Sequence, residues 1–326
     1  MRGSPETPTK GSPAGFARKA FSNPCFAIGA ALVAALFLFT LAGVIYTPYP
    51  PNKIDRTAVS LGPDLRHPFG TDNLGRDILS RVMYAGRTAF AVGMCTAALS
   101  FLAGTLLGIV SGFSAAGNHV FDAGKPAAGV GKLVSDLSGG RAARAVRRSR
   151  ILTAGAADVV LTRLADVMRC IPAILLAMMI IAVFGSSLIN TIFAISVIYT
   201  PSFYRIVRSG VIQIKGREYV TWARIAGVKK WRIMFLHILP NLTSSLIVMT
   251  SLTIAQAILA ETALTYLGLG VQPPTPSWGR MLSEAQRSIL SAPWESVSVG
   301  VCVSLMILGF NLLGDGLRDT LDVRLD

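Results

Sequence analysis

The sequence predicts an all-α integral membrane protein with six transmembrane helices, on the strength of three observations. Of its 326 residues, 52% are hydrophobic and only 15% are charged, whereas soluble domains average about a quarter charged residues. Uncharged apolar runs recur along the chain, and about 20 helical residues suffice to cross a bilayer. The net charge of +14 lies mainly in segments that an even number of crossings would place on one side of the membrane.

The first apolar run covers residues 23–46 and follows a tail at residues 1–22. Arg18 and Lys19 precede it, as basic residues precede the core of a secretory signal peptide. The run is longer than such a core, and the sequence "TPYPPNK" after it is a poor cleavage region. We therefore expect a retained anchor helix.

Residues 47–87 form an external segment that ends in the sequence "HPFGTDNLGRDILSRVMYAG". A cap within Thr71–Asn73 predicts a helix that begins near Leu74, with an apolar stripe between Ile78 and Met83. This helix is either a short interfacial element that leads into the second span or a docking surface for an external partner.

The second span is expected at residues 88–113, where small residues four apart suit close helix packing in lipid. Residues 164–204 are too long for one span, and the sequence "FGSSLIN" offers a turn within them. The remaining segments follow in order: a basic insertion at 114–163, spans at 164–184 and 187–204, a polar loop at 205–240, a span at 241–266, an external loop at 267–295, a span at 296–316 and a tail at 317–326.

Six spans would place both termini on the same side of the membrane. That side would also hold 23 of the 31 Lys and Arg residues, and cytoplasmic loops carry such an excess. Both termini, the insertion and the loop at 205–240 are therefore expected in the cytoplasm. Because the basic residues are spread among these loops rather than gathered on one folded surface, anionic lipid is a better partner for them than nucleic acid.

Catalytic and metal chemistry find little support in the sequence. The four cysteines lie in or beside apolar runs without a CxxC pair, and the three histidines are far apart. The stretch "GKPAAGVGKL" fails as a phosphate-binding loop because Pro126 replaces the first Gly and Leu133 replaces the final Ser or Thr. We expect no catalytic residue, no metal site and no bound cofactor in this chain.

The fifth span and the loop after it carry two further features. Glu261 ends an otherwise apolar run, and an ionisable group near lipid depth is a functional candidate unless the helix has already reached the interface. With Gln256 it forms a candidate pair for a translocation pathway. The prolines that precede Trp278 predict a rigid external loop, with this Trp at headgroup level.

The loop at 205–240 is patterned rather than merely polar. Residues Glu218–Ala226 predict a helix with aromatic residues on one face, and Gly227 suits a left-handed helix end. Trp231–Ile238 predict a second amphipathic helix, after which Pro240 marks the entry into the fifth span. This pair of helices is a lipid-binding segment, a DNA-binding helix-turn-helix or a rigid knob for a cleft on a soluble motor. Attachment to lipid at both ends weighs against DNA.

The stretch "EYVTWARIAGVKKWRIMFLHILPN" resembles the cytoplasmic coupling motif of ABC-importer permeases, with Ala223, Gly227, Leu239 and Pro240 at matching positions. "HPFGTDNLGRDILSR", "AETALTYLGLGVQPPTPSWG" and "FNLLGDGLRDTLD" are similar to other signatures of the dipeptide, oligopeptide and nickel permease family. Thr221, Trp222 and His237 depart from the coupling motif, and the basic insertion is longer than the usual connection.

The resemblance implies a type I ABC importer permease fold over about residues 86–316, in a bacterial cytoplasmic (inner) membrane. The chain would be a transporter subunit rather than an enzyme, with a second homologous permease subunit, two ATPase subunits that carry ATP and Mg, and an external substrate-binding protein as partners. The expected cargo is a di- or oligopeptide, with nickel or another small solute as the alternative. A polybasic membrane interaction protein remains the rival from another class.

The resemblance also assigns roles to particular residues. Those expected to meet the ATPase are Glu218, Tyr219, Trp222, Ala223, Arg224, Gly227, Trp231, Leu239 and Pro240. Those expected to dock the binding protein are Asp72, Asn73, Arg76, Asp77 and Trp278.

Overall fold

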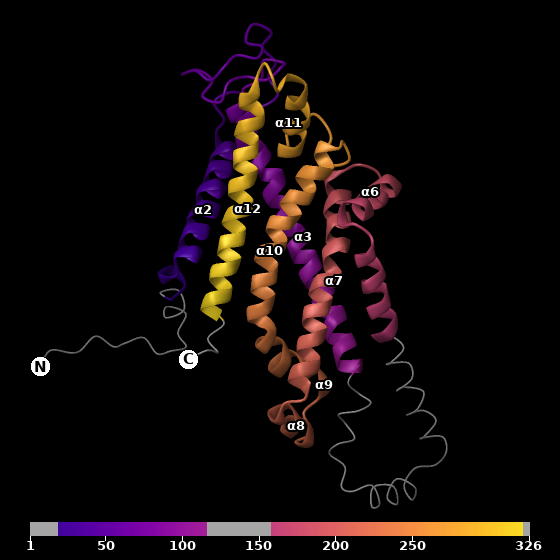
Figure 1. The fold of residues 1–326 in the computed structure, drawn as a ribbon. Coiled ribbons are helices and arrows are strands. Elements are labelled where there is room, and N and C mark those ends of the chain that lie inside the picture. The colour runs from indigo at the N-terminus through magenta and orange to yellow at the C-terminus, as the bar shows by residue number, and fades with distance from the viewer. Residues whose placement is uncertain (1–18, 116–157, 322–326) are drawn as a thin grey trace, which may run out of the picture. The chain divides into compact units, whose positions relative to one another are not determined.

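The computed structural model describes residues 19–115 and 158–321, and within these ranges the chain is helical without a named strand (Figure 1). The helices are α2 (Pro24–Ile45), α3 (Ile78–Ala115), an unlabelled helix Asp158–Cys170, α6 (Ala173–Phe184), α7 (Leu188–Lys215), α8 (Glu218–Ile225), α9 (Lys230–Arg232), the π-helix η1 (Ile233–Ile238), α10 (Leu239–Tyr266), α11 (Trp278–Ala285), the 3₁₀-helix η2 (Gln286–Ser288) and α12 (Pro293–Leu321).

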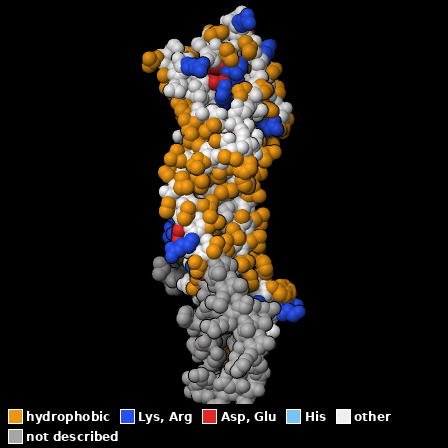
Figure 2. Space-filling model, turned by 90° about the vertical axis from the view of Figure 1, so that its right-hand side faces the viewer, with side chains coloured by type: hydrophobic (Ala, Val, Ile, Leu, Met, Phe, Trp, Pro, Cys, Tyr) orange, Lys and Arg blue, Asp and Glu red, His pale blue; other side chains and the backbone are white. Residues whose placement is uncertain are grey.

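Among the described residues, four helices are long and apolar enough to cross a membrane: Pro24–Ile45, Ile78–Ser114, Lys230–Tyr266 and Pro293–Leu321. A fifth crossing results if Asp158–Cys170 and Ala173–Phe184, which meet at 100°, count as one broken span. The expected span at 187–204 lies within α7, which is not among the four. On the face drawn in Figure 2, hydrophobic side chains predominate over its middle.

The expected third span, 164–184, is not one straight helix. Its first part is already helical at Asp158, the first described residue of this stretch, and stops at Cys170, with two residues between it and α6. Pro172 explains the break, since proline lacks a backbone donor and disfavours helical geometry in the residue before it. The predicted turn after this span is confirmed: Gly185 has φ +88° at the end of α6, and Asn190 Nδ2 donates to the carbonyl of Gly185 at 2.9 Å.

The described residues divide into two compact units, here unit 1 (Met1–Leu99, Ala173–Ile198 and Ile247–Asp326) and unit 2 (Ser100–Pro172 and Tyr199–Leu246). In unit 1, α2 and α12 lie side by side (Figure 1). A Cβ on Gly29 would lie 2.4 Å from the backbone nitrogen of Leu313, and one on Gly316 would lie 2.4 Å from that of Phe26. Glycine therefore lets these two backbones approach at two levels of the helices.

The core of unit 1 gathers side chains from α2, α3, α10, α11 and α12. Ile78, Ile258, Met281 and Met306 are fully buried in it, and Trp278 is 1% exposed. Because lipid is as apolar as these side chains, tight packing rather than escape from water holds such helices together.

The start of α3 corrects the expected short interfacial helix near Leu74. Residues 71–77 form a loop, and one unbroken helix runs from Ile78 to Ala115. Asp77 caps it, because its Oδ2 accepts a hydrogen bond from the backbone nitrogen of Ser80 at 2.8 Å. Gly86 does not end the helix: a Cβ there would lie 2.2 Å from Thr40 Oγ1, so this glycine serves packing against α2.

The entry into the fifth span also differs from expectation. The helix does not begin after Pro240 but is continuous over Lys230–Tyr266, with Pro240 in the first turn of α10. The π-helix η1 directly precedes that turn. Proline is tolerated there because the wider π turn directly before it changes the local hydrogen-bond register, so that the missing backbone donor is accommodated.

In unit 2, the C-terminal half of α3 packs closely on α7. A Cβ on Gly104 would lie 2.4 Å from Phe203 Cβ, and one on Gly108 would lie 2.8 Å from the carbonyl oxygen of Tyr204. Gly112 repeats the arrangement one turn later against the carbonyl of Arg208, at 2.9 Å. The small residues four apart that the sequence suggested for close packing thus lie at a helix contact.

Candidate functional site

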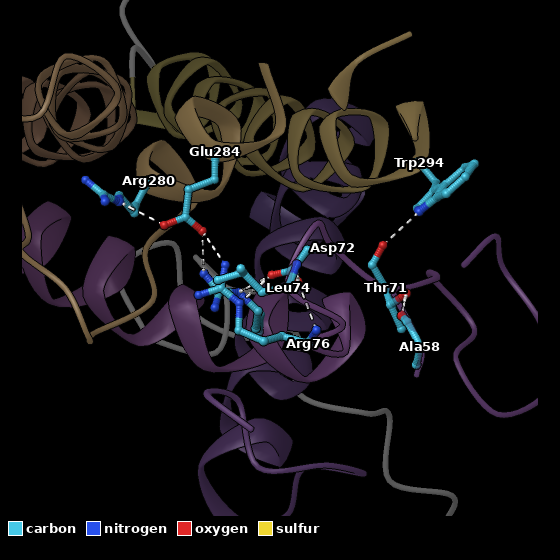
Figure 3. Close-up of polar contacts among 9 residues, drawn as sticks. Ala58, Thr71, Asp72, Leu74, Arg76, Arg280, Glu284 and Trp294 are labelled. Atoms are coloured by element: carbon cyan, nitrogen blue, oxygen red, sulfur yellow. Dashed lines mark hydrogen bonds and ion pairs between the residues drawn. The ribbon is translucent and has the colours of Figure 1, made fainter. Parts of the chain in front are cut away.

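Two regions carry the predicted functional residues: a cluster of charged side chains in unit 1, and the segment of α8 and α9 in unit 2. The unit 1 cluster begins in the loop before α3 (Figure 3). Asp72 Oδ1 accepts hydrogen bonds from the backbone nitrogens of Leu74 and Arg76, both at 2.9 Å. Gly75 has φ +76° and would, with a Cβ, collide with the carbonyl oxygen of Asp55 at 1.8 Å. The loop therefore closes tightly around the Asp72 carboxylate.

Glu284 of α11 is the centre of this cluster. Arg76 Nη2 donates to its Oε2 at 2.6 Å, Arg81 Nη2 donates to the same oxygen at 3.1 Å, and Arg280 Nε donates to Oε1 at 3.0 Å. Burial raises the pKa of the Glu284 carboxyl, but the positive charge of Arg81 and the bonds from Arg280 and Arg76 outweigh it and hold the pKa below its ordinary value. Glu284 is thus a carboxylate that joins the loop before α3 to α11.

The Arg81 side chain is only 2% exposed. Its Nε lies 3.8 Å from Asp72 Oδ2, so it faces two carboxylates at once. Buried charges of this kind are tolerated only when they are paired and hydrogen-bonded. The ion pairs of the cluster therefore tie the loop before α3 and the first turn of α3 to α11.

Three of the five residues predicted to dock the binding protein lie in the interior: Asp72, Asp77 and Trp278. Asn73 and Arg76 are half-buried. Asp77 also lies 2.9 Å from His67 Nδ1 through its Oδ1, in addition to capping α3. All five belong to unit 1, but what they form together is mainly an internal framework beneath the loop surface.

The expected headgroup position of Trp278 is wrong. This side chain is 1% exposed and donates its Nε1–H to the backbone carbonyl of Val82 at 3.1 Å. The next residue, Gly279, lets the start of α11 lie against the backbone of α10, since a Cβ there would lie 2.3 Å from the carbonyl oxygen of Thr262. An indole has one donor, and a buried one needs an acceptor. Here the acceptor is in the first turns of α3.

Sequence reasoning missed Glu284 and Trp294, which complete the cluster. Trp294 Nε1 donates to the carbonyl of Thr71 at 3.2 Å, and the Thr71 hydroxyl donates in turn to the carbonyl of Ala58 (Figure 3). A usable signal was present in Glu284, because a carboxylate in a chain with few charges needs a partner. The i,i+4 spacing of Arg280 and Glu284 could have identified one partner, whereas no spacing indicated Arg76 or Arg81.

The α8 segment follows the prediction closely. The expected helix at Glu218–Ala226 is confirmed as α8, with Ala226 as its last cap residue. Gly227 has φ +78°, and Val228 N donates to the carbonyl of Ala223 at 3.1 Å. This is the left-handed helix end that the sequence indicated. The second amphipathic helix is present as α9 and η1.

The predicted aromatic face of α8 points outward. Trp222 is 68% exposed and Ile225 is 71% exposed, while Val220 on the opposite side is fully buried. Trp231 of α9 is also exposed. Asn241 Nδ2 donates to Tyr219 Oη at 3.3 Å and so links α8 to the start of α10. An exposed apolar surface of this kind is typical of a partner or membrane contact.

The other residues predicted to meet the ATPase complete this surface. Glu218, Gly227 and Pro240 are exposed, and the half-buried ones are Ala223, Arg224 and Leu239. Val220 and Ile233 supply the buried side that holds the segment in place.

The two pathway candidates on α10 do not share an environment. Gln256 is exposed, whereas Glu261 is fully buried and accepts a hydrogen bond from Thr265 Oγ1 at 2.9 Å. Thr265 Oγ1 also accepts from the backbone nitrogen of Val271 at 3.2 Å. Glu261 therefore supports the turn after α10, and it is inside the protein rather than at a lipid interface.

Comparison of the sequence with known proteins identifies a family and several relatives. Residues 150–326 match the family described as "Binding-protein-dependent transport system inner membrane component". The dipeptide transport system permease protein DppC of Alkalihalophilus pseudofirmus is 34% identical over 303 residues, which cover 93% of this chain and 87% of the relative.

Two further relatives agree with it. The di/tripeptide transport system permease protein DppC of Pseudomonas aeruginosa is 35% identical over 94% of this chain and 91% of its own length. The glutathione transport system permease protein GsiD of Pectobacterium atrosepticum is 33% identical over 90% and 87%. The chain therefore belongs to the inner membrane components of binding-protein-dependent transport systems and is a permease subunit of an ABC transporter rather than an enzyme.

Proposed function

We propose that this chain forms half of the translocation pathway of an ATP-driven importer for di- or oligopeptides and couples ATPase motion to alternating access. The exposed segment from α8 to α9, anchored by Val220 and bent at Gly227, is the observation that carries the coupling role. The names of the relatives, which refer to dipeptides, di/tripeptides and glutathione, support the cargo class.

The coupling step would use the α8 segment as a knob on the ATPase. Two ATPase subunits would hold ATP and Mg, and closure of their dimer on ATP binding would displace the knob. Trp222, Ile225 and Trp231 offer the apolar contact area, and Glu218 and Arg224 border it with charge. A second homologous permease subunit, or a second copy of this chain, would complete the pathway. The chain itself needs no cofactor for this role.

The proposed topology has six spans with both termini in the cytoplasm, and it places the α8 segment and the insertion on the same side. The Lys and Arg asymmetry supports it. The segment at 187–204, which is the first part of α7, would be the fourth span in chain order and would bring the number of spans to six. Labelling of single introduced cysteines in each loop of intact cells tests this arrangement. Reaction of a cysteine at Trp222 with a membrane-impermeant reagent added outside would contradict it.

The unit 1 cluster is proposed to shape the docking surface for the external binding protein. Because Asp72, Asp77 and Trp278 are buried, they would act by holding the loop, while Arg76 and the exposed side chain of Leu74 would make contact. Leu74→Asp should weaken stimulation of ATP hydrolysis by the binding protein and leave the thermal stability of the chain unchanged. Full stimulation of this variant would remove Leu74 from the docking surface.

Purification from the native membrane with a photo-crosslinker at Trp222 tests the coupling role directly. We expect crosslinks to an ABC ATPase, and fewer of them when the crosslinker replaces an exposed residue on the lipid-crossing helices, such as Val301. Crosslinks from Trp222 to lipid alone would favour the rival polybasic membrane protein. The molecule bound to the co-purified external binding protein, identified by mass spectrometry, would separate peptide cargo from nickel or another small solute.

A further inference from the structure

The helix Asp158–Cys170 carries a polar stripe that faces α7. Asp158, Thr162 and Asp166 lie four residues apart and so share one side of the helix. Each contacts a polar side chain of α7, and together these contacts form what we call the polar seam. All of its members belong to unit 2.

The strongest contact in the polar seam is at its beginning. Arg208 Nε donates to Asp158 Oδ1 at 2.8 Å and Arg208 Nη2 donates to Oδ2 at 2.9 Å. This two-bond fork fixes direction as well as distance, because a planar guanidinium matches a carboxylate only in a narrow range of orientations. The hydroxyls of Thr162 and Tyr204 follow, 2.9 Å apart.

A third helix closes the seam. The Ser111 hydroxyl of α3 donates to Asp158 Oδ1 and lies 2.8 Å from the Tyr204 hydroxyl. Ser111, Asp158 and Tyr204 are all buried. Ser111 can reach across because the neighbouring glycines of α3 allow close approach to α7. The Asp158 carboxylate is therefore bound from two helices at once.

The contact at the other end of the polar seam, between Asp166 and Arg205, is exposed to solvent. Asp166 Oδ1 accepts from Arg205 Nη2 at 3.0 Å, but the two side chains are 45% and 54% exposed. Solvent screens exposed pairs of this kind, so they contribute little to stability. The two ion pairs thus join the same helices through the same residue types, but the Asp166 pair is more exposed and has one bond instead of a fork.

The helix α7 leads directly into the α8 segment. Only Gly216 and Arg217 separate Lys215, the last residue of α7, from α8, and Arg217 N donates to the carbonyl of Ile214 at 3.0 Å. This short connection lets a displacement of α8 pass to α7, in addition to the link from α8 to α10 through Tyr219 and Asn241. The polar seam is a route from α7 to the helix Asp158–Cys170.

We infer that Asp158 and Arg208 are positioning residues, whose two-bond fork makes the helix Asp158–Cys170 move with α7 as one body when the α8 segment moves. This inference rests on the proposed coupling function. An apolar contact could slide or repack with small changes in energy, whereas breaking the fork leaves the buried Asp158 carboxylate without the half-buried Arg208 guanidinium. The fork therefore selects one register between the two helices.

The first test compares Asp158→Asn with Asp166→Asn in the complete transporter, reconstituted with its ATPases and binding protein. Asp158→Asn should reduce ATP-driven uptake at least tenfold while the complex still assembles and hydrolyses ATP without stimulation by the binding protein. Arg208→Lys, which keeps the charge but loses the fork, should fall between this variant and the wild type. Asp166→Asn is the matched control and should stay within twofold of wild type.

The second test needs no disruptive variant. Spin labels at Val167→Cys and Ser209→Cys, two exposed positions on the helix Asp158–Cys170 and on α7, are introduced after replacement of the native cysteines. Their distance should be the same in the resting complex and in the complex trapped with a transition-state analogue of ATP hydrolysis. A change between the two states would overturn the inference, even if Asp158→Asn failed to fold.

The results also separate the two proposals. Uptake by Asp158→Asn equal to that of Asp166→Asn, in a preparation whose wild type transports, would overturn the inference alone. Absence of ATP-driven uptake by the wild-type complex would remove the proposed function, and the inference with it.

Discussion

Replacement of Gly227 by valine should separate membrane insertion from transport. The φ of +78° at this position lies in the left-handed region, and no described residue lies within 4 Å of the place that a Cβ would occupy. The cost therefore comes from the backbone alone, at about 1–2 kcal/mol for a residue with a Cβ and more for a β-branched one. That corresponds to a loss of roughly 5–30-fold in the population of the bent segment.

The assay is uptake by the reconstituted complex, with insertion checked by the amount of chain in the membrane. Gly185→Val is the matched control, because Gly185 has φ +88° and an equally open Cβ position among the described residues, but ends α6 rather than α8. We expect uptake to fall for Gly227→Val and to remain for Gly185→Val, at equal insertion. Wild-type uptake by Gly227→Val would refute the role of the bend, and equal losses in both variants would refute its specificity.

Three further predictions concern the charged cluster and its surroundings. Trp278→Phe should lower the free energy of unfolding by about 0.5–1.5 kcal/mol, since it removes one buried hydrogen bond to a carbonyl that keeps its donor within the helix. Thermal unfolding in detergent measures this change, and Trp222→Phe on the surface should change the free energy of unfolding little. Arg81→Met should lower the free energy of unfolding by roughly 3 kcal/mol. This is the lower end for loss of one partner of a buried ion pair, because Arg76 still binds Glu284. An unchanged midpoint of thermal unfolding would contradict this prediction. The lowered pKa of Glu284 should stabilise the folded protein fully at pH values above the ordinary carboxyl pKa of 4.5, and this stabilisation should be lost as the pH falls through the pKa in the folded state. Glu284→Gln should therefore reduce the loss of stability at acid pH. An identical dependence of stability on pH in this variant would exclude Glu284 as its cause.

Local signals in the sequence predicted local structure well. Gly227 indicated a left-handed helix end, and the structure has it at φ +78°. "FGSSLIN" indicated a turn, and the structure ends α6 there. The apolar run at 23–46 agrees with α2 within one residue at each end. These features depend on propensities and periods within a few residues, so they are readable without knowledge of the fold.

Predictions at helix ends were less successful where neighbouring elements decide the outcome. The loop before α3 continues past Leu74 because Asp72 binds the loop's own backbone nitrogens instead of capping a helix. Pro240 does not begin the fifth span because a π-helix precedes it. Pro172 breaks the third span, although the run that begins at Cys170 is uncharged.

The amino-acid sequence alone determined the membrane class, the family and the bend at Gly227, because hydropathy, motif spacing and glycine geometry are properties of short stretches. Only the tertiary structure decided that Trp278 is buried, that Glu284 binds Arg76 and Arg81, and that Asp158 pairs with Arg208. Residues that lie 50 to more than 200 positions apart have no regular spacing in the sequence that could reveal their contact. Whether a charge is buried depends on which helices meet around it, and that is a property of the packed molecule.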